Sequence, residues 1–240
     1  MDNEMLNITN GDYFNEYFKK KFGEISVSFC EAMMDGETVK NIYSQEFVVL
    51  RAKSLNVTID EYKTKMHVPD ALKGNNYEKI SLWFGKDTFC QMNLLTLLAY
   101  LEQIKYQGEI KLNYIDDETF AVLESNIDVK LGIYNKIYED VLILNKVLND
   151  VGVLNSQAID LYFDYKKENG KLVKLVKANL DKNKNELISI LLKQSKEYGL
   201  SDLQAERIIN RFYYRINKTL WNNILKEGVF LWQNFIVLKK

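Results

Sequence analysis

The sequence predicts an α/β protein: a small, mainly parallel sheet flanked by helices, of the Rossmann-like type, followed by a mostly helical C-terminal part. Two observations lead to this fold class. Over residues 1–120, short apolar runs typical of strands alternate with segments of helical periodicity, and strands joined by helical crossovers lie parallel. Over residues 121–240, helical periodicity dominates. We therefore expect two domains, with residues 1–120 in the first and residues 121–240 in the second.

Four runs in the first domain have the length and the pattern of strands: Met5–Thr9, Ile25–Phe29, Lys79–Phe84 and Glu109–Ile115. Apolar residues at helical spacing follow each of the first three runs. The helix after the third run is apolar around more than half of its circumference, so it must be buried on several sides. Residues 67–76 contain the single proline and a Gly-Asn-Asn sequence, and we expect them to form a loop.

The second domain has four segments of helical periodicity, at residues 133–148, 154–168, 183–197 and 202–218. Ser201 and Gln204 have the spacing of a capping box at the start of the last segment, and Gly199 supplies the break before it. The last two helices therefore have the proportions of a helix-turn-helix pair. Residues 229–231 and 235–238 are predicted to form a small terminal hairpin.

The composition excludes several classes of protein. No run of eighteen apolar residues occurs, so no membrane span is expected, and the acidic start of the chain is unlike a signal peptide. Two cysteines without CxxC spacing are too few for a disulfide scaffold, and a single histidine excludes a multi-histidine metal site. A cytoplasmic location fits all of these features. The sequence does not indicate an oligomeric state.

Charge is distributed unevenly along the chain. Residues 160–240 have sixteen Lys and Arg against nine Asp and Glu, a net charge of +7. Residues 1–159 have sixteen against twenty-four, a net charge of −8. The basic half is therefore expected to meet either a polyanion or the acidic half of the same chain.

Polar residues gather after the predicted parallel strands, where ligands bind in open α/β sheets. They are Asn10, Gly11 and Asp12 after the first strand, Glu31 after the second, and Asp87, Gln91 and Asn93 after the third. Asp12 and Asp87 would hold a Mg²⁺ ion beside a phosphate. We therefore predict a site for a small anionic or nucleotide-like ligand, although neither a GxGxxG motif nor a P-loop is present.

Three of the acidic and nucleophilic residues have alternative roles. Asp12 is well placed to cap the helix that begins at Tyr13. Thr88 and Gln91 have capping-box spacing, which would make Thr88 the cap and leave Asp87 available for a ligand. Cys90 lies in the first turn of its helix, where a thiolate is favoured, but it is more simply a small packing residue.

A basic helix offers a second candidate function. On residues 202–218, four basic side chains fall within about 80° of arc at 100° per residue: Arg207, Arg211, Arg215 and Lys218. Such a row on the second helix of a helix-turn-helix pair would contact phosphates or base edges of a nucleic acid. Alternatively, the row is a solvated face, and the protein is a non-catalytic scaffold.

Several motifs give the first domain a resemblance to a known family. They are Ile8-Thr9-Asn10-Gly11-Asp12, Glu31-Ala32-x-x-x-Gly36, Arg51, and Leu82-Trp83-Phe84-x-x-Asp87-x-Phe89-Cys90-Gln91-x-Asn93-Leu94-Leu95. Over about residues 5–120 the chain resembles an uncharacterised bacterial family, domain of unknown function 1835. The resemblance implies importance for the polar strand-end residues and for Arg51, which would pair with the anion. It implies no reaction, because the family has no assigned activity.

The chain departs from that family at two places. The family usually shows Glu-His where this chain has Gly85-Lys86, and an aromatic-Arg pair where it has Phe29-Cys30. A reaction that depended on those residues in relatives would be altered or absent here.

Overall fold

The computed structural model describes residues 5–74 and 77–216 of the 240-residue chain. These residues divide into two compact units. The first contains the described residues up to Asp164 together with Glu197–Gly199, and the second contains Tyr165–Lys196 and the described residues from Leu200 onward. The first unit therefore continues beyond residue 120, where we expected a domain boundary, and takes in part of the helical region.

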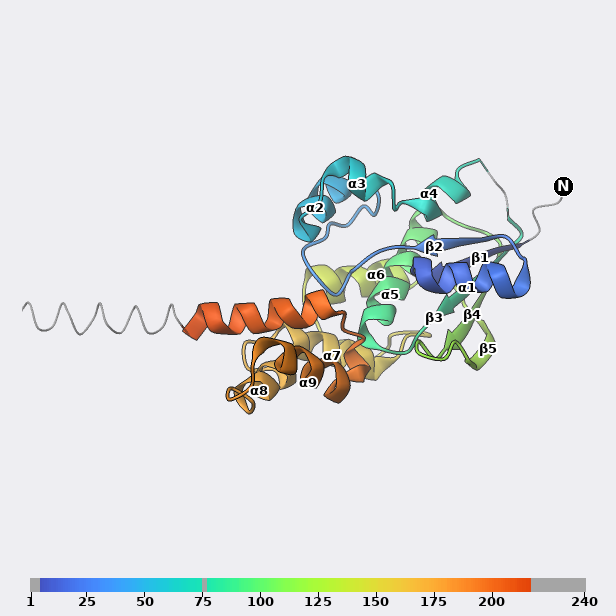
Figure 1. The fold of residues 1–240 in the computed structure, drawn as a ribbon. Coiled ribbons are helices and arrows are strands. Elements are labelled where there is room, and N and C mark those ends of the chain that lie inside the picture. The colour runs from blue at the N-terminus through green and yellow to red at the C-terminus, as the bar shows by residue number, and fades with distance from the viewer. Residues whose placement is uncertain (1–4, 75–76, 217–240) are drawn as a thin grey trace, which may run out of the picture. The chain divides into compact units, whose positions relative to one another are not determined.

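The first unit is built on a five-stranded sheet with helices on both sides, which confirms the α/β class (Figure 1). Its strands are β1 (Met5–Asn10), β2 (Ser26–Phe29), β3 (Lys79–Phe84), β4 (Glu109–Ile115) and β5 (Val122–Asp128). Their order is β2-β1-β3-β4-β5. The first four strands run parallel, and β5 pairs antiparallel with β4.

The two faces of the sheet differ in chemistry because side chains alternate along each strand. On one face lie apolar side chains that are 0% exposed: Leu6, Ile8, Ile80, Leu82, Phe84 and Leu112. On the other lie buried polar side chains: Asn7, Thr9, Ser26, Ser28, Ser81 and Asn113. A parallel sheet is usually apolar on both faces, so the polar face is a distinctive feature of this chain.

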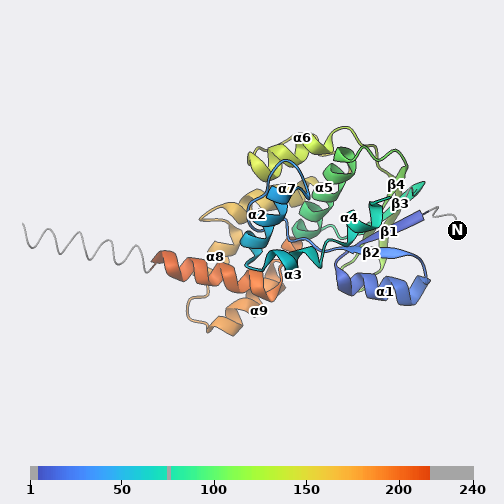
Figure 2. The ribbon, with the colours of Figure 1, turned by 90° about the horizontal axis from the view of Figure 1, so that it is seen from above.

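Helices α1 (Asp12–Phe22) and α5 (Thr88–Gln103) lie on opposite sides of the sheet (Figure 2). The ring of Phe18 on α1 lies 5.1 Å from the ring of Trp83, whose Nε1 donates to Asn7 Oδ1 on the polar face. Helix α1 therefore covers the polar face, and α5 covers the apolar face. The apolar sequence of α5 is explained by this position, because most of its residues are buried.

The remaining helical elements vary in length. They are α2 (Gln45–Leu55), α3 (Ile59–Lys63), α4 (His67–Leu72), α6 (Tyr134–Tyr138), a π-helical turn (Glu139–Ile143), α7 (Ser156–Lys166), α8 (Lys171–Lys177), α9 (Lys184–Gln194), a 3₁₀ turn (Lys196–Tyr198) and a helix over residues 202–216. None of the helices in the described ranges combines the length and apolar character needed to cross a lipid bilayer.

Two expectations about local structure were wrong. Residues 67–76 were expected to be a loop, but α4 occupies His67–Leu72, since Pro69 stands in its first turn, where a proline costs no helical hydrogen bond. No strand was expected between residue 117 and the predicted terminal hairpin, yet β5 forms at Val122–Asp128. Its side chains are almost all exposed, so it lacks the apolar alternation by which strands are recognised. The predicted terminal hairpin lies outside the described residues.

The capping box and the glycine break predicted at the start of the last described helix are confirmed. The Ser201 backbone N–H donates to Gln204 Oε1 at 3.0 Å, and the Gln204 backbone N–H donates to Ser201 Oγ at 3.3 Å. Gly199 has φ +64°, the left-handed conformation expected at a helix break. Ala205, Ile208 and Phe212 form a buried face of this helix.

Candidate functional site

The topology of the sheet places a switch point at the carboxyl ends of β1 and β3. The chain leaves β1 toward β2 on one side and later returns to β3 on the other side, so the two crossovers diverge at this point. Ligands of open α/β sheets usually bind beside such a switch point. Asn10, Gly11 and Asp12 follow β1, Asp87 follows β3, and Asp117 follows β4.

Asp12 belongs to a polar group beside β2. Its carboxylate accepts from Ser28 Oγ at 2.6 Å and from Cys30 Sγ at 3.1 Å, and it lies 2.6 Å from Lys65 Nζ and 4.0 Å from His67 Nε2. The bond to Lys65 and the bond to Ser28 hold the pKa of Asp12 well below its usual range. Burial raises the pKa of Cys30 to about 11, so its thiol is protonated at neutral pH.

Asp12 is not the cap of α1, contrary to our expectation. It is the first residue of the helix, and Gly11 occupies the N-cap position with φ 82° and no side-chain cap. The first turn of α1 therefore lacks a side-chain cap. This turn lies at the carboxyl end of the sheet, where ligands bind in open α/β sheets.

Asn93 and Asn10 form a buried link between α5 and the end of β1. Asn93 Nδ2 donates to Asn10 Oδ1 at 3.0 Å and to the Glu31 carbonyl at 2.7 Å, and Asn93 Oδ1 accepts from the Met33 backbone N–H at 3.0 Å. Asn10 Nδ2 in turn lies 2.9 Å from Cys90 Sγ. Burial raises the pKa of Cys90 well above its ordinary value, so this thiol acts as a neutral packing residue.

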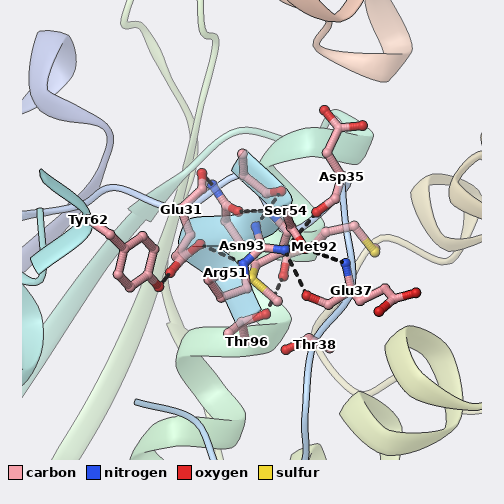
Figure 3. Close-up of polar contacts among 12 residues, drawn as sticks. Glu31, Asp35, Glu37, Thr38, Arg51, Ser54, Tyr62, Met92, Asn93 and Thr96 are labelled. Atoms are coloured by element: carbon pink, nitrogen blue, oxygen red, sulfur yellow. Dashed lines mark hydrogen bonds and ion pairs between the residues drawn. The ribbon is translucent and has the colours of Figure 1, made fainter. Parts of the chain in front are cut away.

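Arg51 and Glu31 form a buried ion pair (Figure 3). Arg51 Nε lies 3.3 Å from Glu31 Oε2, and Tyr62 donates its hydroxyl to the same carboxylate. The guanidinium also donates to three backbone carbonyls, those of Ala32, Asp35 and Glu37. Arg51 is 0% exposed. Its charge is therefore used within the protein, to hold the segment after β2, and is not exposed to solvent as the charge of an anion partner would be.

The side-chain amide of Gln91 also forms its hydrogen bonds within the protein. Its Nε2 donates to the Gly85 carbonyl at 2.6 Å, and its Oε1 accepts from the Asn155 backbone N–H at 2.8 Å. Gln91 is 0% exposed. It therefore ties the loop after β3 to the segment before α7.

Asp87 caps α5, which corrects the expectation that Thr88 would do so. Asp87 Oδ1 accepts from the Cys90 backbone N–H at 3.0 Å. The Thr88 hydroxyl instead donates to the Glu197 carbonyl at 3.1 Å, which attaches the 197–199 segment to the start of α5. Asp87 thus has a structural role at the start of α5.

A cluster of two carboxyl groups and one thiol is formed by Asp87, Asp117 and Cys90. One ligand atom from each lies within 4.8 Å of the others, and Cys90 Sγ lies 3.5 Å from Asp117 Oδ1. Asp117 as a whole residue is exposed, but its carboxyl group lies against the Cys90 thiol. The pKa of Asp117 is raised to about 8. Burial of its carboxyl group is the larger cause, and the nearby Asp87 is the second. The Asp117 carboxyl therefore keeps its proton at neutral pH.

Two glycines make room for these carboxylates. A Cβ atom at Gly85 would overlap with the carboxylate of Asp117, and one at Gly199 would overlap with that of Asp87.

The structure groups the predicted acidic residues differently from the sequence analysis. Asp87 lies with Asp117, whereas Asp12 lies with Cys30 and His67. Asp117 was missed, although it follows β4 just as Asp87 follows β3. The signal was therefore present, because the strand-end rule applies to the fourth strand as well.

In the second unit, the predicted basic row is exposed at Arg207, Arg211 and Arg215. Arg215 Nη2 lies 3.2 Å from a carboxylate oxygen of Glu168. Lys218, the fourth member of the row, lies outside the described residues.

No family model, no curated protein and no solved structure matches this chain. The similarity to domain of unknown function 1835 thus stays a prediction that depends on the motif residues alone.

Proposed function

We propose that the protein binds a divalent cation, with Mg²⁺ as the leading candidate, together with a small anionic or nucleotide-like ligand at the carboxyl ends of β1, β3 and β4. The observation that carries this proposal is the pairing of Asp87 with Asp117, in which the pKa of Asp117 is raised to about 8. Two carboxylates held together against their mutual repulsion are stabilised by a proton or by a metal ion.

The donor set suits a hard cation. Carboxylate oxygens are the ligands that Mg²⁺ prefers, and it commonly uses one or two of them and completes its shell with water and ligand phosphates. The Cys90 thiol is kept neutral by burial, so it is not expected to coordinate.

The anion would be received by the start of α1. Its first turn has no side-chain cap, and Gly11 has nothing within 4 Å of the position of a Cβ atom, so a ligand can approach the backbone closely. Contacts from Asn10 to Cys90 and from Cys90 to Asp117 connect this helix start to the carboxylate pair. An anion there would bridge the helix N-terminus and the cation, in place of the pairing with Arg51 that the sequence suggested.

Thermal unfolding in the presence of MgCl₂, phosphate and nucleoside phosphates tests the proposal. Mg²⁺ at a hundred times its Kd should stabilise the protein by about 2.7 kcal/mol. Asp117→Asn should remove this response. Asp128→Asn, which removes an exposed carboxylate on β5, should keep it. Absence of stabilisation by Mg²⁺, or equal stabilisation of Asp117→Asn, would contradict the proposal.

A second candidate function is nucleic-acid binding by the helix over residues 202–216, in a helix-turn-helix-like pair with α9. It is favoured by the exposure of Arg207, Arg211 and Arg215 on one face. Binding to duplex DNA or RNA at low salt should weaken in Arg211→Ala and should show a smaller dependence on salt. Lys193→Ala, an exposed charge on α9, is the matched control. No binding at low ionic strength would eliminate this function.

A further inference from the structure

A second cluster of metal-ligating side chains lies beside the edge strand β2 and is distinct from the Asp87–Asp117 pair. One ligand atom each from Asp12, Cys30 and His67 lies within 4.8 Å of the others. The three residues come from separate elements, since Asp12 begins α1, Cys30 follows β2 and His67 begins α4. Helices α1 and α4 both pack against β2 (Figure 2). The fold therefore brings the single histidine of the chain to one of its two cysteines.

The contacts within this cluster converge on one atom, Asp12 Oδ1. Cys30 Sγ lies 3.1 Å from this oxygen, and His67 Nε2 lies 4.0 Å from it. Bonds of about 2.0–2.3 Å in a tetrahedral zinc site place neighbouring ligand atoms about 3.4–3.6 Å apart. The two distances in the protein lie on either side of this spacing, so shifts of about 0.5 Å would bring the three atoms to the geometry of a zinc site.

A carboxylate, a thiol and an imidazole together form a donor set that suits zinc. Zn²⁺ binds all three types of ligand, whereas Mg²⁺ and Ca²⁺ take oxygen ligands. The thiol and the imidazole therefore separate this cluster from the proposed magnesium site. Three protein ligands leave the fourth tetrahedral position to water, which is the arrangement of catalytic zinc sites rather than of structural ones.

The ligand atoms are accessible from solvent. The side chains of Asp12 and His67 are 44% and 41% exposed. Both residues also line a cavity of about 350 Å³, to which Glu16 and Lys19 of α1 contribute as well. An ion and its bound water can therefore reach the cluster without unfolding of the surrounding elements.

The neighbours of Asp12 hold its carboxylate in place. Ser28 Oγ donates to Oδ1 at 2.6 Å, and Lys65 Nζ lies 2.6 Å from the other oxygen, Oδ2. Hydrogen bonds of this kind fix the orientation of a ligating carboxylate. Lys65 thus leaves Oδ1 to the cysteine and the histidine, and its side chain, 54% exposed, keeps its charge in contact with water.

We propose that Asp12, Cys30 and His67 bind a zinc ion, with a water molecule as the fourth ligand. In the structure, Cys30 donates its thiol proton to Asp12. Zinc takes the place of this proton: the S–H bond breaks, the sulfur keeps the electron pair and bonds to the ion, and the proton passes to solvent.

Cobalt titration tests the donor set, because Co²⁺ occupies tetrahedral zinc sites and a thiolate ligand gives it a charge-transfer band in the near ultraviolet. Wild type should show this band, and added zinc should abolish it by displacing the cobalt. Cys30→Ser should lack the band, whereas Cys90→Ser should keep it; circular dichroism checks that both variants are folded. No cobalt binding, binding without the band, or a band that depends on Cys90 would overturn the proposal.

Zinc affinity, measured by competition with a chromophoric chelator, tests the other two ligands. His67→Ala and Asp12→Asn should each weaken binding by at least about a hundredfold, since loss of a group that merely orients a ligand already costs about 10–100-fold. Asp70→Asn, which changes an exposed carboxylate on α4, is the matched control and should bind zinc like wild type. Wild-type affinity in either ligand variant would contradict the assigned site.

A crossed pair of measurements separates this site from the proposed cation site. Asp117→Asn should leave zinc affinity unchanged, and Cys30→Ser should leave the thermal response to Mg²⁺ unchanged. If either variant lost both responses, the two ions would share one site, and a separate zinc site would be excluded.

Discussion

Arg51 and Glu31 form an ion pair from which solvent is excluded, with side-chain exposures of 0% and 3%. A pair in this position is held in place by the hydrogen bonds around it, and the carbonyls after β2 together with the Tyr62 hydroxyl supply them. The pair therefore fixes the path of the chain between β2 and α2.

Replacing Arg51 should be severely destabilising. Arg51→Met leaves Glu31 buried without its cation, and breaking one side of a buried pair costs about 3–5 kcal/mol of unfolding free energy. Urea denaturation measures this loss. Lys53→Met on the same helix changes an exposed residue and should stay within about 0.5 kcal/mol of wild type. Wild-type stability in Arg51→Met would mean that the pair does not order this segment.

Asp117 should make stability depend on pH in the sense opposite to most carboxylates. Its pKa is raised from 3.8 to about 8 on folding, so the folded state holds the proton more tightly than the unfolded chain does. The stability that this group contributes is present below about pH 4 and is lost as the pH rises to about 8. The stability of Asp117→Asn relative to wild type should therefore increase over this range and then become level. A difference that does not vary with pH would contradict the raised pKa.

Affinity for Mg²⁺ should rise with pH for the same reason. The metal must displace the proton on Asp117, so up to one proton is released for each ion bound. The Kd measured by calorimetry should fall by up to about tenfold per pH unit between pH 6 and pH 8, and change little above. Calorimetry in two buffers of different ionisation enthalpy counts the released proton. Proton release of zero at pH 7 would rule out a protonated Asp117 at the metal site.

Substitutions of Asp87 should separate its two roles. Asp87→Asn keeps a good N-cap for α5, whereas Asp87→Ala removes the cap and should cost about 1 kcal/mol more. Both variants should lose the response to Mg²⁺, because both lack the carboxylate charge. Retention of the response in Asp87→Asn would leave Asp87 with the capping role alone.

Gly85→Ala should disturb the site through Asp117. The added methyl group overlaps with the Asp117 carboxylate, so we expect lower stability and a weaker response to Mg²⁺. Combining it with Asp117→Ala removes the overlap, and the double variant should be more stable than the sum of the two single effects predicts. Additive effects in denaturant titrations would show that the two residues do not touch.

The parallel part of the sheet was predictable from the sequence because its strands are buried. Lys79–Phe84 and Glu109–Ile115 have the bounds expected, and the other two parallel strands differ by one residue at one end. β5 was not predictable, since a strand exposed along almost its whole length carries no apolar pattern.

The site was predictable in its location but not in its contacts. The strand-end rule indicated the right edge of the sheet, but hydrogen bonding decides which residues are available there. Gln91 and Asn93 look like ligand-binding amides in the sequence, yet both bond to backbone groups far away in the chain, those of Asn155 and Glu31. The Asp87–Asp117 pair depends on Gly85 and Gly199, and the latter comes from a segment that no local pattern connects to the sheet.

The return of Glu197–Gly199 to the first unit limits how the protein can be dissected. A chain truncated after Asp164 would keep every strand but would lose the carbonyl that accepts from Thr88 and the glycine beside Asp87. Such a fragment would lack the contacts that Glu197 and Gly199 make with the first residues of α5. Deleting the intervening residues and joining the ends with a short linker is the way to obtain the sheet by itself.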